Sequence, residues 1–230
     1  HRAFPDQVPL RVAVNVSARQ LAQSGFDDKV RQALTVHPVP PAAICLEITE
    51  GALMVDIEAA WSALRVLKRL GVKLALDDFG TGYSSLSYLR RFSLDTLKID
   101  QSFVKGMTES TEDAAIVKHV VAMARALGMV TVAEGIETPE QLAALHRLGC
   151  EHGQGFLMSK PVPADEITRL LRQGRQVARP FGGVQEPRHR VPVNPFDRID
   201  VTAPVSPEEL LGPAQPSTVA TGEPPLAAER

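Results

Sequence analysis

Apolar and polar positions alternate along this chain in two rhythms from Arg11 to about Arg172. Short runs with a period of two are rich in β-branched residues, a pattern typical of strands. They lie at residues 11–17, 44–50, 72–79, 96–104 and 129–134, with a less distinct sixth run at 153–158. Between these runs the apolar positions recur every three or four residues, which predicts helices. Strands that alternate with helices predict an α/β fold, a parallel sheet covered by helices.

Three of the predicted helices have clear ends. The first helix ends before Gly71, and its apolar face consists of Ile57, Ala60, Trp61, Leu64 and Leu67. The second helix ends before Gly128, and its apolar face consists of Ile116, Val117, Val120, Ala124 and Leu127. The third begins with a capping box formed by Thr138 and Gln141, with Pro139 at the first helical position. It ends at Gly149, and its predicted buried stripe is Leu142, Leu145 and Leu148.

The number of strands leaves two fold types open, because six fit either a doubly wound sheet or a (β/α)₈ barrel that lacks two units. Beyond residue 174 the composition changes. More than half of the 18 prolines lie at 180–225, among Gly, Ser, Thr, Glu and Ala. Such a segment has too little apolar surface to offset chain entropy. We therefore expect a folded domain over residues 1–174 and a Pro-rich disordered tail over residues 175–230.

Bulk composition narrows the function classes. A net charge of −2 and an aromatic content of 5% give no support for a nucleic-acid polymer as a partner. The two cysteines, Cys45 and Cys150, form neither a disulfide framework nor a zinc motif. Free cysteines are usual in a reducing compartment, so we expect a cytoplasmic domain.

Polar side chains lie near the carboxyl ends of several predicted strands, where a strand covered on both faces should be apolar. They are Asn15, Glu47, Asp77, Asp78, Lys98 and Glu134. The carboxyl ends of parallel strands meet at one edge, so these side chains are expected to converge. Several carboxylates together are costly to bury without counter-charge, and divalent cations bound through oxygen supply that charge. The pattern predicts a metal-binding acidic site, and two such ions would suit phosphoryl transfer.

Each of these residues also has an ordinary interpretation when it is taken alone. Asp77 and Asp78 precede a glycine-containing stretch and are compatible with a simple exit from strand to loop. Lys98 could be a surface lysine paired with Asp100, and Glu47 a solvated acid. The glycines match neither a dinucleotide fingerprint nor a P-loop. The shared position of the polar residues at successive strand ends is what favours a site.

Six segments of the chain, in the same order, resemble motifs of the EAL family, and together they extend from about Val12 to Leu171. They are Asn-Val-Ser-Ala-Arg-Gln-Leu at 15–21, Leu-Glu-Ile-Thr-Glu at 46–50, Asp-Asp-Phe-Gly-Thr-Gly-Tyr-Ser-Ser-Leu at 77–86, Leu-Lys-Ile-Asp at 97–100, Val-Ala-Glu-Gly-Ile-Glu-Thr at 132–138 and Gly-Gln-Gly-Phe-Leu-Met-Ser-Lys-Pro at 153–161. The resemblance implies a TIM-like (β/α)₈ barrel of EAL type with one antiparallel strand, incomplete here at about six of eight strand–helix units.

The resemblance also implies an activity, which is hydrolysis of cyclic di-GMP to linear pGpG in bacterial second-messenger signalling. The implied mechanism uses two ions of Mg²⁺ or Mn²⁺. By this resemblance the metal ligands are Asn15, Glu47, Asp77 and Asp78. Lys98 and Glu134 resemble the catalytic residues that position or activate the attacking water. Supporting residues would be Glu50, Asp100, Glu137 and Gln154.

The same resemblance implies a homodimer formed through the loop after Asp78, around residues 80–85, with Glu50 as the anchor of that loop. The sequence departs mildly from the family pattern at two positions. Phe156 stands where tyrosine is frequent in the family, and Glu151 stands where aspartate is frequent. The Glu-Ala-Leu segment, with its metal-binding glutamate, lies upstream of the Asn15 segment in the family and does not occur in this sequence. A catalytically inactive cyclic di-GMP receptor or protein-interaction module is therefore an alternative, and an unrelated metal-dependent barrel hydrolase is a third.

The chain begins with His1 and not with methionine. We therefore expect a longer intact protein, in which an upstream sensor or GGDEF domain, or a membrane anchor, would precede this segment. No apolar run within the 230 residues reaches the length of a membrane span.

Overall fold

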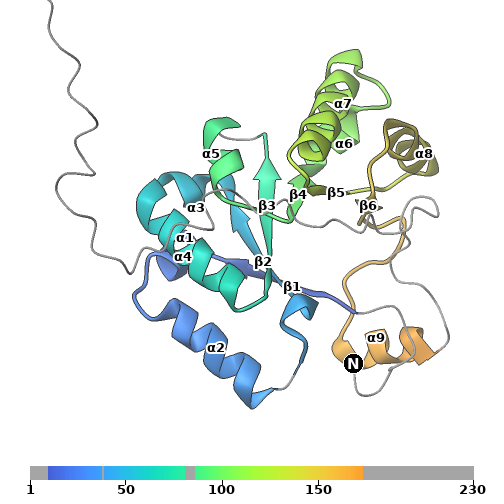
Figure 1. Ribbon diagram of the computed structural model, residues 1–230. Coiled ribbons are helices and arrows are strands. Elements are labelled where there is room, and N and C mark those ends of the chain that lie inside the picture. Colours follow the sequence, from blue (N-terminus) through green and yellow to red (C-terminus); the bar gives the residue numbers. More distant parts are fainter. Residues whose placement is uncertain (1–9, 38, 81–85, 173–230) are drawn as a thin grey trace, which may run out of the picture. The chain divides into compact units, whose positions relative to one another are not determined.

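The computed structural model of this protein describes residues 10–37, 39–80 and 86–172. Its strands form one parallel sheet in which each strand pairs with the next along the chain. They are β1 (Val12–Val16), β2 (Ile44–Thr49), β3 (Lys73–Phe79), β4 (Thr96–Ile99), β5 (Val130–Ala133) and β6 (His152–Gly153). Figure 1 shows this order as a progression of colour from blue β1 to yellow β6. The predicted parallel α/β sheet is confirmed, and the antiparallel strand implied by the resemblance is not among the described strands.

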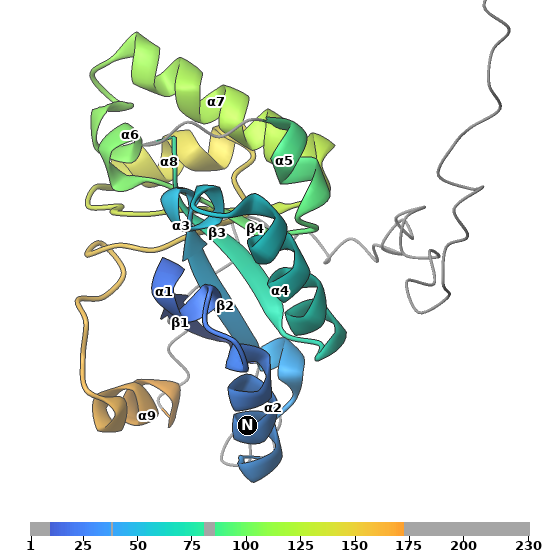
Figure 2. The ribbon, with the colours of Figure 1, turned by 90° about the vertical axis from the view of Figure 1, so that its left-hand side faces the viewer.

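Helices connect the successive strands, and one further helix follows the last strand. They are α1 (Ala18–Leu21), α2 (Phe26–Val36), α3 (Glu50–Met54), α4 (Ile57–Arg69), α5 (Leu86–Arg91), α6 (Gln101–Gly106), α7 (Thr111–Ala126), α8 (Pro139–Leu148) and α9 (Ala164–Arg172), with a short 3-10 helix at Pro41–Ala43. Figure 2 shows α4 alongside β3, and these two elements are in contact. Helix α7 contacts β4, β5 and α8. No helix in the described part of the chain is long and apolar enough to cross a membrane.

The hydrophobic core lies between the sheet and these helices. Strands β2, β3 and β4 contribute Leu46, Ile48, Leu74, Leu76, Leu97 and Ile99, all of which are buried. Helix α4 buries Ala60, Leu64 and Leu67 from its predicted apolar face, which is thereby confirmed. Strand β1 has only one neighbour among the described strands, and its Val12 and Val14 are exposed.

The third predicted helix is confirmed as α8. The Thr138 hydroxyl accepts a hydrogen bond from the backbone N–H of Gln141, whose side-chain oxygen accepts one from the backbone N–H of Thr138. Leu145 is fully buried, and Leu142 and Leu148 are partly buried against the core. Gly149 ends the helix with φ +79°, a left-handed conformation that glycine adopts at little cost.

Three local predictions are wrong. The strand predicted at 96–104 stops at Ile99, because the side chain of Asp100 caps helix α6 by accepting a hydrogen bond from the backbone N–H of Ser102 at 2.9 Å. The strand predicted at 153–158 is only two residues long, and residues 155–158 form a bend and a turn. Ile116 on α7 is exposed, whereas Val121 is buried. The tail predicted at 175–230 and the boundary at 174 lie outside the described residues.

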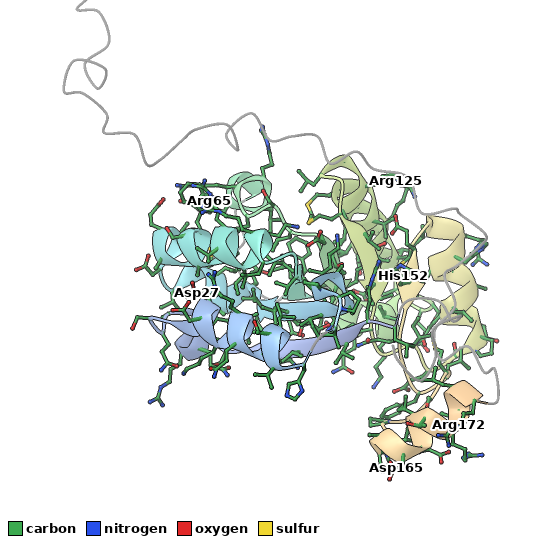
Figure 3. All side chains as sticks on the ribbon, turned by 60° about the horizontal axis from the view of Figure 1, so that its bottom comes forward. Asp27, Arg65, Arg125, His152, Asp165 and Arg172 are labelled. Carbon is green, nitrogen blue, oxygen red and sulfur yellow. The ribbon has the colours of Figure 1, made fainter. Side chains whose placement is uncertain are left out.

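The outer surface of the chain carries a stacked group on α4 and α5. The guanidinium carbon of Arg65, whose side chain is labelled in Figure 3, lies 4.7 Å from the centre of the Trp61 ring. The guanidinium carbon of Arg91 lies 4.5 Å from the centre of the same ring. The guanidinium nitrogens of Arg91 donate two hydrogen bonds to the Glu58 carboxylate, the longer of 2.8 Å. The contacts of Arg91 attach α5 to α4 at the surface, whereas Arg65 and Trp61 both lie on α4.

At the amino ends of β3 and β4, Asp95 joins the two strands. Its carboxylate accepts hydrogen bonds from Lys68 Nζ at 2.8 Å, Lys73 Nζ at 3.0 Å and the backbone N–H of Leu74 at 2.9 Å. Burial alone would raise the pKa of Asp95, but these bonds outweigh it and hold the pKa below its ordinary value. The carboxylate therefore stabilises the folded state in its charged form.

Replacement of Asp95 by asparagine is expected to lower the free energy of unfolding by about 1.5–3 kcal/mol at pH 7, as for loss of hydrogen bonds to a charged group. Because the pKa is lower in the folded state, this contribution is complete above the unfolded pKa of about 3.9 and is lost as the pH falls through the folded value. Urea unfolding at pH 7 and pH 3 should show that the difference in the free energy of unfolding between Asp95→Asn and the wild type is smaller at pH 3. Asp28→Asn is the control, because its exposed pair with Arg31 spans 3.7 Å and should matter little.

Candidate functional site

The site lies where several strands of the sheet end. Strand β2 carries Glu47, β3 carries Asp77 and Asp78, β4 carries Lys98, and Glu134 directly follows β5. Since every pair of strands is parallel, their carboxyl ends point to the same edge, where α/β folds place their sites. The structure thus brings together side chains that are up to 87 positions apart in the chain, from 47 to 134.

Lys98 is at the centre of this group. Its Nζ lies 2.9 Å from Glu47 Oε2, 2.7 Å from Asp77 Oδ1 and 2.7 Å from Glu134 Oε1. The residue is only 4% exposed, so it is not the surface lysine of the ordinary interpretation. Burial alone would lower the pKa of Lys98, but the hydrogen bonds with Asp77, Glu134 and Glu47 outweigh it and raise the pKa. Lys98 is therefore a buried ammonium paired with three carboxylates.

Asp77 and Asp78 reach the site although they are adjacent in a strand, where neighbouring side chains normally point to opposite faces. The register between β3 and β4 shifts between Leu76 and Phe79, and Asp78 has a positive φ of 53°. Aspartate tolerates this left-handed region better than most residues. This local irregularity allows both carboxylates to face one place.

Carboxylate oxygens of Asp77, Asp78 and Glu134 all lie within 4.8 Å of one another. Burial and the nearby carboxylates of Asp77 and Asp100 raise the pKa of Asp78, against the opposite effect of Lys98. Three oxygen donors at this spacing fit a hard divalent cation such as Mg²⁺ or Mn²⁺, which favours carboxylate ligands. The chemistry of the donor set thus suits the predicted metal.

Glu134 is held from a second side by Gln154. The side-chain amide of Gln154, just beyond β6, donates to Glu134 Oε1 at 2.6 Å. Burial raises the pKa of Glu134, and the hydrogen bond from Lys98 opposes that rise without cancelling it. A carboxylate with a raised pKa is a better proton acceptor than an ordinary glutamate near neutral pH.

Two cavities flank the carboxylates. One, of about 700 Å³, is lined by Asn15, Ser17 and Gln20 from the first strand and its following turn, by Thr49, and by Asp77 and Asp78. Asn15 is the strand partner of Glu47 in the register of β1 and β2. The other cavity, of about 660 Å³, is lined by Glu134, Glu137, Gln154, Phe156, Met158 and Lys160, among others. The acidic group therefore opens toward solvent on two sides.

The remaining predicted residues support neighbouring backbone. Glu50 is 2% exposed, and its Oε2 accepts a hydrogen bond from the backbone N–H of Gly80 at 3.3 Å. Of the loop predicted to form the dimer, Gly80 alone is described, and residues 81–85 lie outside the described residues. Asp100 caps α6, and the exposed Glu137 lies at the rim of the second cavity.

Sequence reasoning missed the turn that walls the first cavity. Ser17 and Gln20 form a capping box at the start of α1, with the Ser17 backbone N–H and hydroxyl donating to Gln20 Oε1 at 3.1 and 2.9 Å. The Ser-x-x-Gln spacing was visible in the sequence and is a known signal for a helix start. This capping box directly follows Asn15 and Val16 of β1 and therefore fixes the direction of the backbone after β1, beside the first cavity.

Comparison with known proteins agrees with this geometry. A protein-family model described as EAL domain matches residues 1–161. MucR of Pseudomonas aeruginosa, a bifunctional diguanylate cyclase/cyclic di-GMP phosphodiesterase, is 46% identical over 156 residues, which are 68% of this chain and 23% of MucR. NbdA of the same organism, a cyclic di-GMP phosphodiesterase, is 46% identical over 171 residues, which are 74% of this chain and 22% of NbdA. The chain thus spans less than a quarter of the length of these curated relatives.

Solved structures give the same result. The MucR phosphodiesterase in complex with c-di-GMP matches with a TM-score of 0.66 at 46% identity, over 68% of this chain and 64% of that chain. The manganese and cyclic di-GMP complex of Klebsiella pneumoniae BlrP1 matches with a TM-score of 0.62 at 35% identity, over 66% of this chain and 39% of that chain.

Proposed function

Because the chain belongs to the EAL domain family, we propose that it hydrolyses cyclic di-GMP to linear pGpG in bacterial second-messenger signalling. The observation that supports this most directly is the group of Asp77, Asp78 and Glu134, whose oxygens lie within 4.8 Å of one another at the carboxyl ends of parallel strands. MucR, whose structure contains c-di-GMP, is 46% identical to this chain. A cluster that can hold a divalent cation beside two open cavities suits a phosphodiester substrate.

The cofactor of this proposal is a pair of Mg²⁺ or Mn²⁺ ions. Asn15, Glu47, Asp77 and Asp78 would hold them, and Glu134 lies close enough to Asp77 and Asp78 to share an ion. Bound divalent ions would supply Lewis acidity, which activates water and offsets charge on the phosphate. The BlrP1 relative was solved with manganese and with cyclic di-GMP.

Glu134 would accept the proton of the attacking water. Its carboxylate is held in one orientation by Gln154 at 2.6 Å and by Lys98 at 2.7 Å. The burial that raises its pKa makes it a stronger base. A homodimer formed through residues 80–85, an upstream sensor or GGDEF domain and a cytoplasmic location remain part of the proposal.

The function is tested by incubating the 230-residue chain with cyclic di-GMP in Mn²⁺ or Mg²⁺ and following pGpG by chromatography. Product should form with metal, disappear on chelation, and fall by at least about 100-fold in Asp77→Asn, because a lost metal ligand removes charge stabilisation worth several kcal/mol. Nucleotide binding without product in the wild type would instead support the receptor alternative. Neither binding nor product would contradict both.

A further inference from the structure

The first cavity has a polar lining with little charge. Apart from Asp77 and Asp78, the described residues that line it are uncharged, and none of them is basic. A phosphate group placed there, away from a cation held by the two aspartates, would have no basic side chain to pair with. The cavity measures about 700 Å³, which is within the range of small-molecule sites. Its lining therefore suits a neutral polar group such as a nucleobase.

Gln20 is the lining residue with a defined orientation. Its side-chain Oε1 accepts one hydrogen bond from the backbone N–H of Ser17 at 3.1 Å and another from the Ser17 hydroxyl at 2.9 Å. A backbone N–H can only donate, so the oxygen of the Gln20 amide, and not its nitrogen, faces Ser17. An amide oxygen has two lone pairs, and both are used by Ser17. The NH₂ group of Gln20 has no hydrogen-bond partner within the described part of the chain.

This bonding restricts which nucleobase Gln20 can recognise. A glutamine with a free oxygen pairs with adenine, because it accepts from the N6 amino group and donates to N7. Gln20 has no acceptor left for an amino group, so only its two N–H donors are available. Guanine presents two acceptors, O6 and N7, along one edge, and these match a group that only donates.

We propose that Gln20 is a specificity-determining residue, whose NH₂ group donates to the O6 and N7 edge of one guanine of cyclic di-GMP in the first cavity. The inference rests on the proposed function and adds the side chain that distinguishes guanine from adenine. Ser17 is the positioning residue of this pair, since it holds the amide oxygen away from the base.

Gln20→Glu separates recognition from folding. Serine followed three residues later by glutamate is as good a capping box as serine followed by glutamine, so the start of α1 should form as before. One carboxylate oxygen replaces Oε1 in the cap, and the other replaces the NH₂ group. The cavity then contains an acceptor where it had two donors, which repels guanine O6 and N7 and accepts from the adenine amino group.

Gln23→Glu is the matched control. It introduces the same charge three positions along the chain, on an exposed glutamine that does not line the first cavity. The side-chain oxygen of Gln23 accepts a hydrogen bond from Lys29 Nζ at 3.2 Å, and glutamate can accept the same bond. Any general effect of the added charge on an anionic ligand should therefore appear in Gln23→Glu as well.

The experiment measures the dissociation constants of cyclic di-GMP and cyclic di-AMP for the full chain and both variants, by calorimetry in Ca²⁺, a cation that carboxylates also bind. The wild type should bind cyclic di-GMP at least about tenfold more tightly than cyclic di-AMP, because only guanine offers two acceptors. In Gln20→Glu the affinity for cyclic di-GMP should fall at least about tenfold and that for cyclic di-AMP should stay or rise. Gln23→Glu should keep the wild-type ratio of the two constants.

Steady-state kinetics with Mn²⁺ provide a second readout. Gln20→Glu should raise KM for cyclic di-GMP at least about tenfold and leave kcat within about threefold, because the base lies away from the reacting phosphate. The Tm of Gln20→Glu should stay within about 2 °C of the wild type, since the cap is kept.

An unchanged ratio of the two constants in Gln20→Glu would overturn the inference and leave Gln20 with its capping role alone. An equal loss of affinity for both dinucleotides would also overturn it, because the amide would then contact a group that both share. A wild type that binds neither dinucleotide would contradict the proposed function itself, and the role of Gln20 with it.

Discussion

Glu134→Gln is expected to lower kcat for cyclic di-GMP hydrolysis by about 10²–10⁴-fold, the range typical of a lost general base. Glutamine keeps the shape of glutamate and its side-chain oxygen, so it can still accept hydrogen bonds from Lys98 and Gln154. It cannot take a proton from water, however. The fold should therefore survive while the chemical step fails, as measured by pGpG formation alongside circular dichroism and urea unfolding.

The control for this variant is Glu140→Gln, the same change on an exposed glutamate in the first turn of α8. It should keep wild-type turnover, because no part of the proposed site involves that side chain. Wild-type turnover in Glu134→Gln would remove the assigned role of Glu134. Loss of the folded state in Glu134→Gln would show a structural role in place of a catalytic one.

Most strands and long helices were predictable because each periodic segment of the sequence was long enough to show its apolar pattern. Strands β1 to β5 and the helices α4, α7 and α8 lie where the apolar pattern predicts them, whereas β6 overlaps its predicted run only at Gly153. The errors occur at ends. Phe103 and Val104 continue the apolar run of β4 in the sequence, but they belong to helix α6, and Val104 is a buried residue of that helix. A short apolar run does not distinguish a strand that continues from a helix that begins.

The gathering of acids at one edge was also predictable, since parallel strands place their carboxyl ends together. The bonding of Lys98 was not. It depends on the direction of three side chains and on the register shift near Asp77 and Asp78, which no pattern in the sequence reports. The family resemblance supplied candidate residues, and the distances show how three of them are bonded to Lys98.

The strand order and the match to solved structures together establish the fold class. Alternation of strands and helices left the doubly wound sheet and the barrel open, and the sequential strand order β1 to β6 matches a barrel arc rather than a sheet with a switch point. The structural match to EAL domains confirms the TIM-like class. What periodicity could not give is the order in which strands pair, because that depends on contacts distant in sequence.

Gly155→Ala is expected to destabilise the protein by about 3–5 kcal/mol. A Cβ on Gly155 would lie 2.2 Å from both the backbone nitrogen and the backbone oxygen of Ile136, and backbone atoms cannot move aside as a flexible side chain would. Ile136 is fully buried and is bonded to this turn, since its N–H donates to Gln154 O at 3.1 Å and its oxygen accepts from Leu157 N at 3.0 Å. Overpacking of this kind typically costs 1–3 kcal/mol, and each of the broken hydrogen bonds adds about 1 kcal/mol.

The same displacement reaches the site, because Gly155 follows Gln154, whose amide holds Glu134 at 2.6 Å. Gly155→Ala should therefore lower turnover as well as the urea midpoint. Gly51→Ala is the matched control for stability, since its Cβ would meet no atom within 4 Å and the residue lies in helix α3. It should leave stability unchanged or raise it by up to about 1 kcal/mol, because alanine favours the helix. Urea unfolding of both variants decides the matter, and a Gly155→Ala protein as stable as Gly51→Ala would mean that the turn does not lie this close to Ile136.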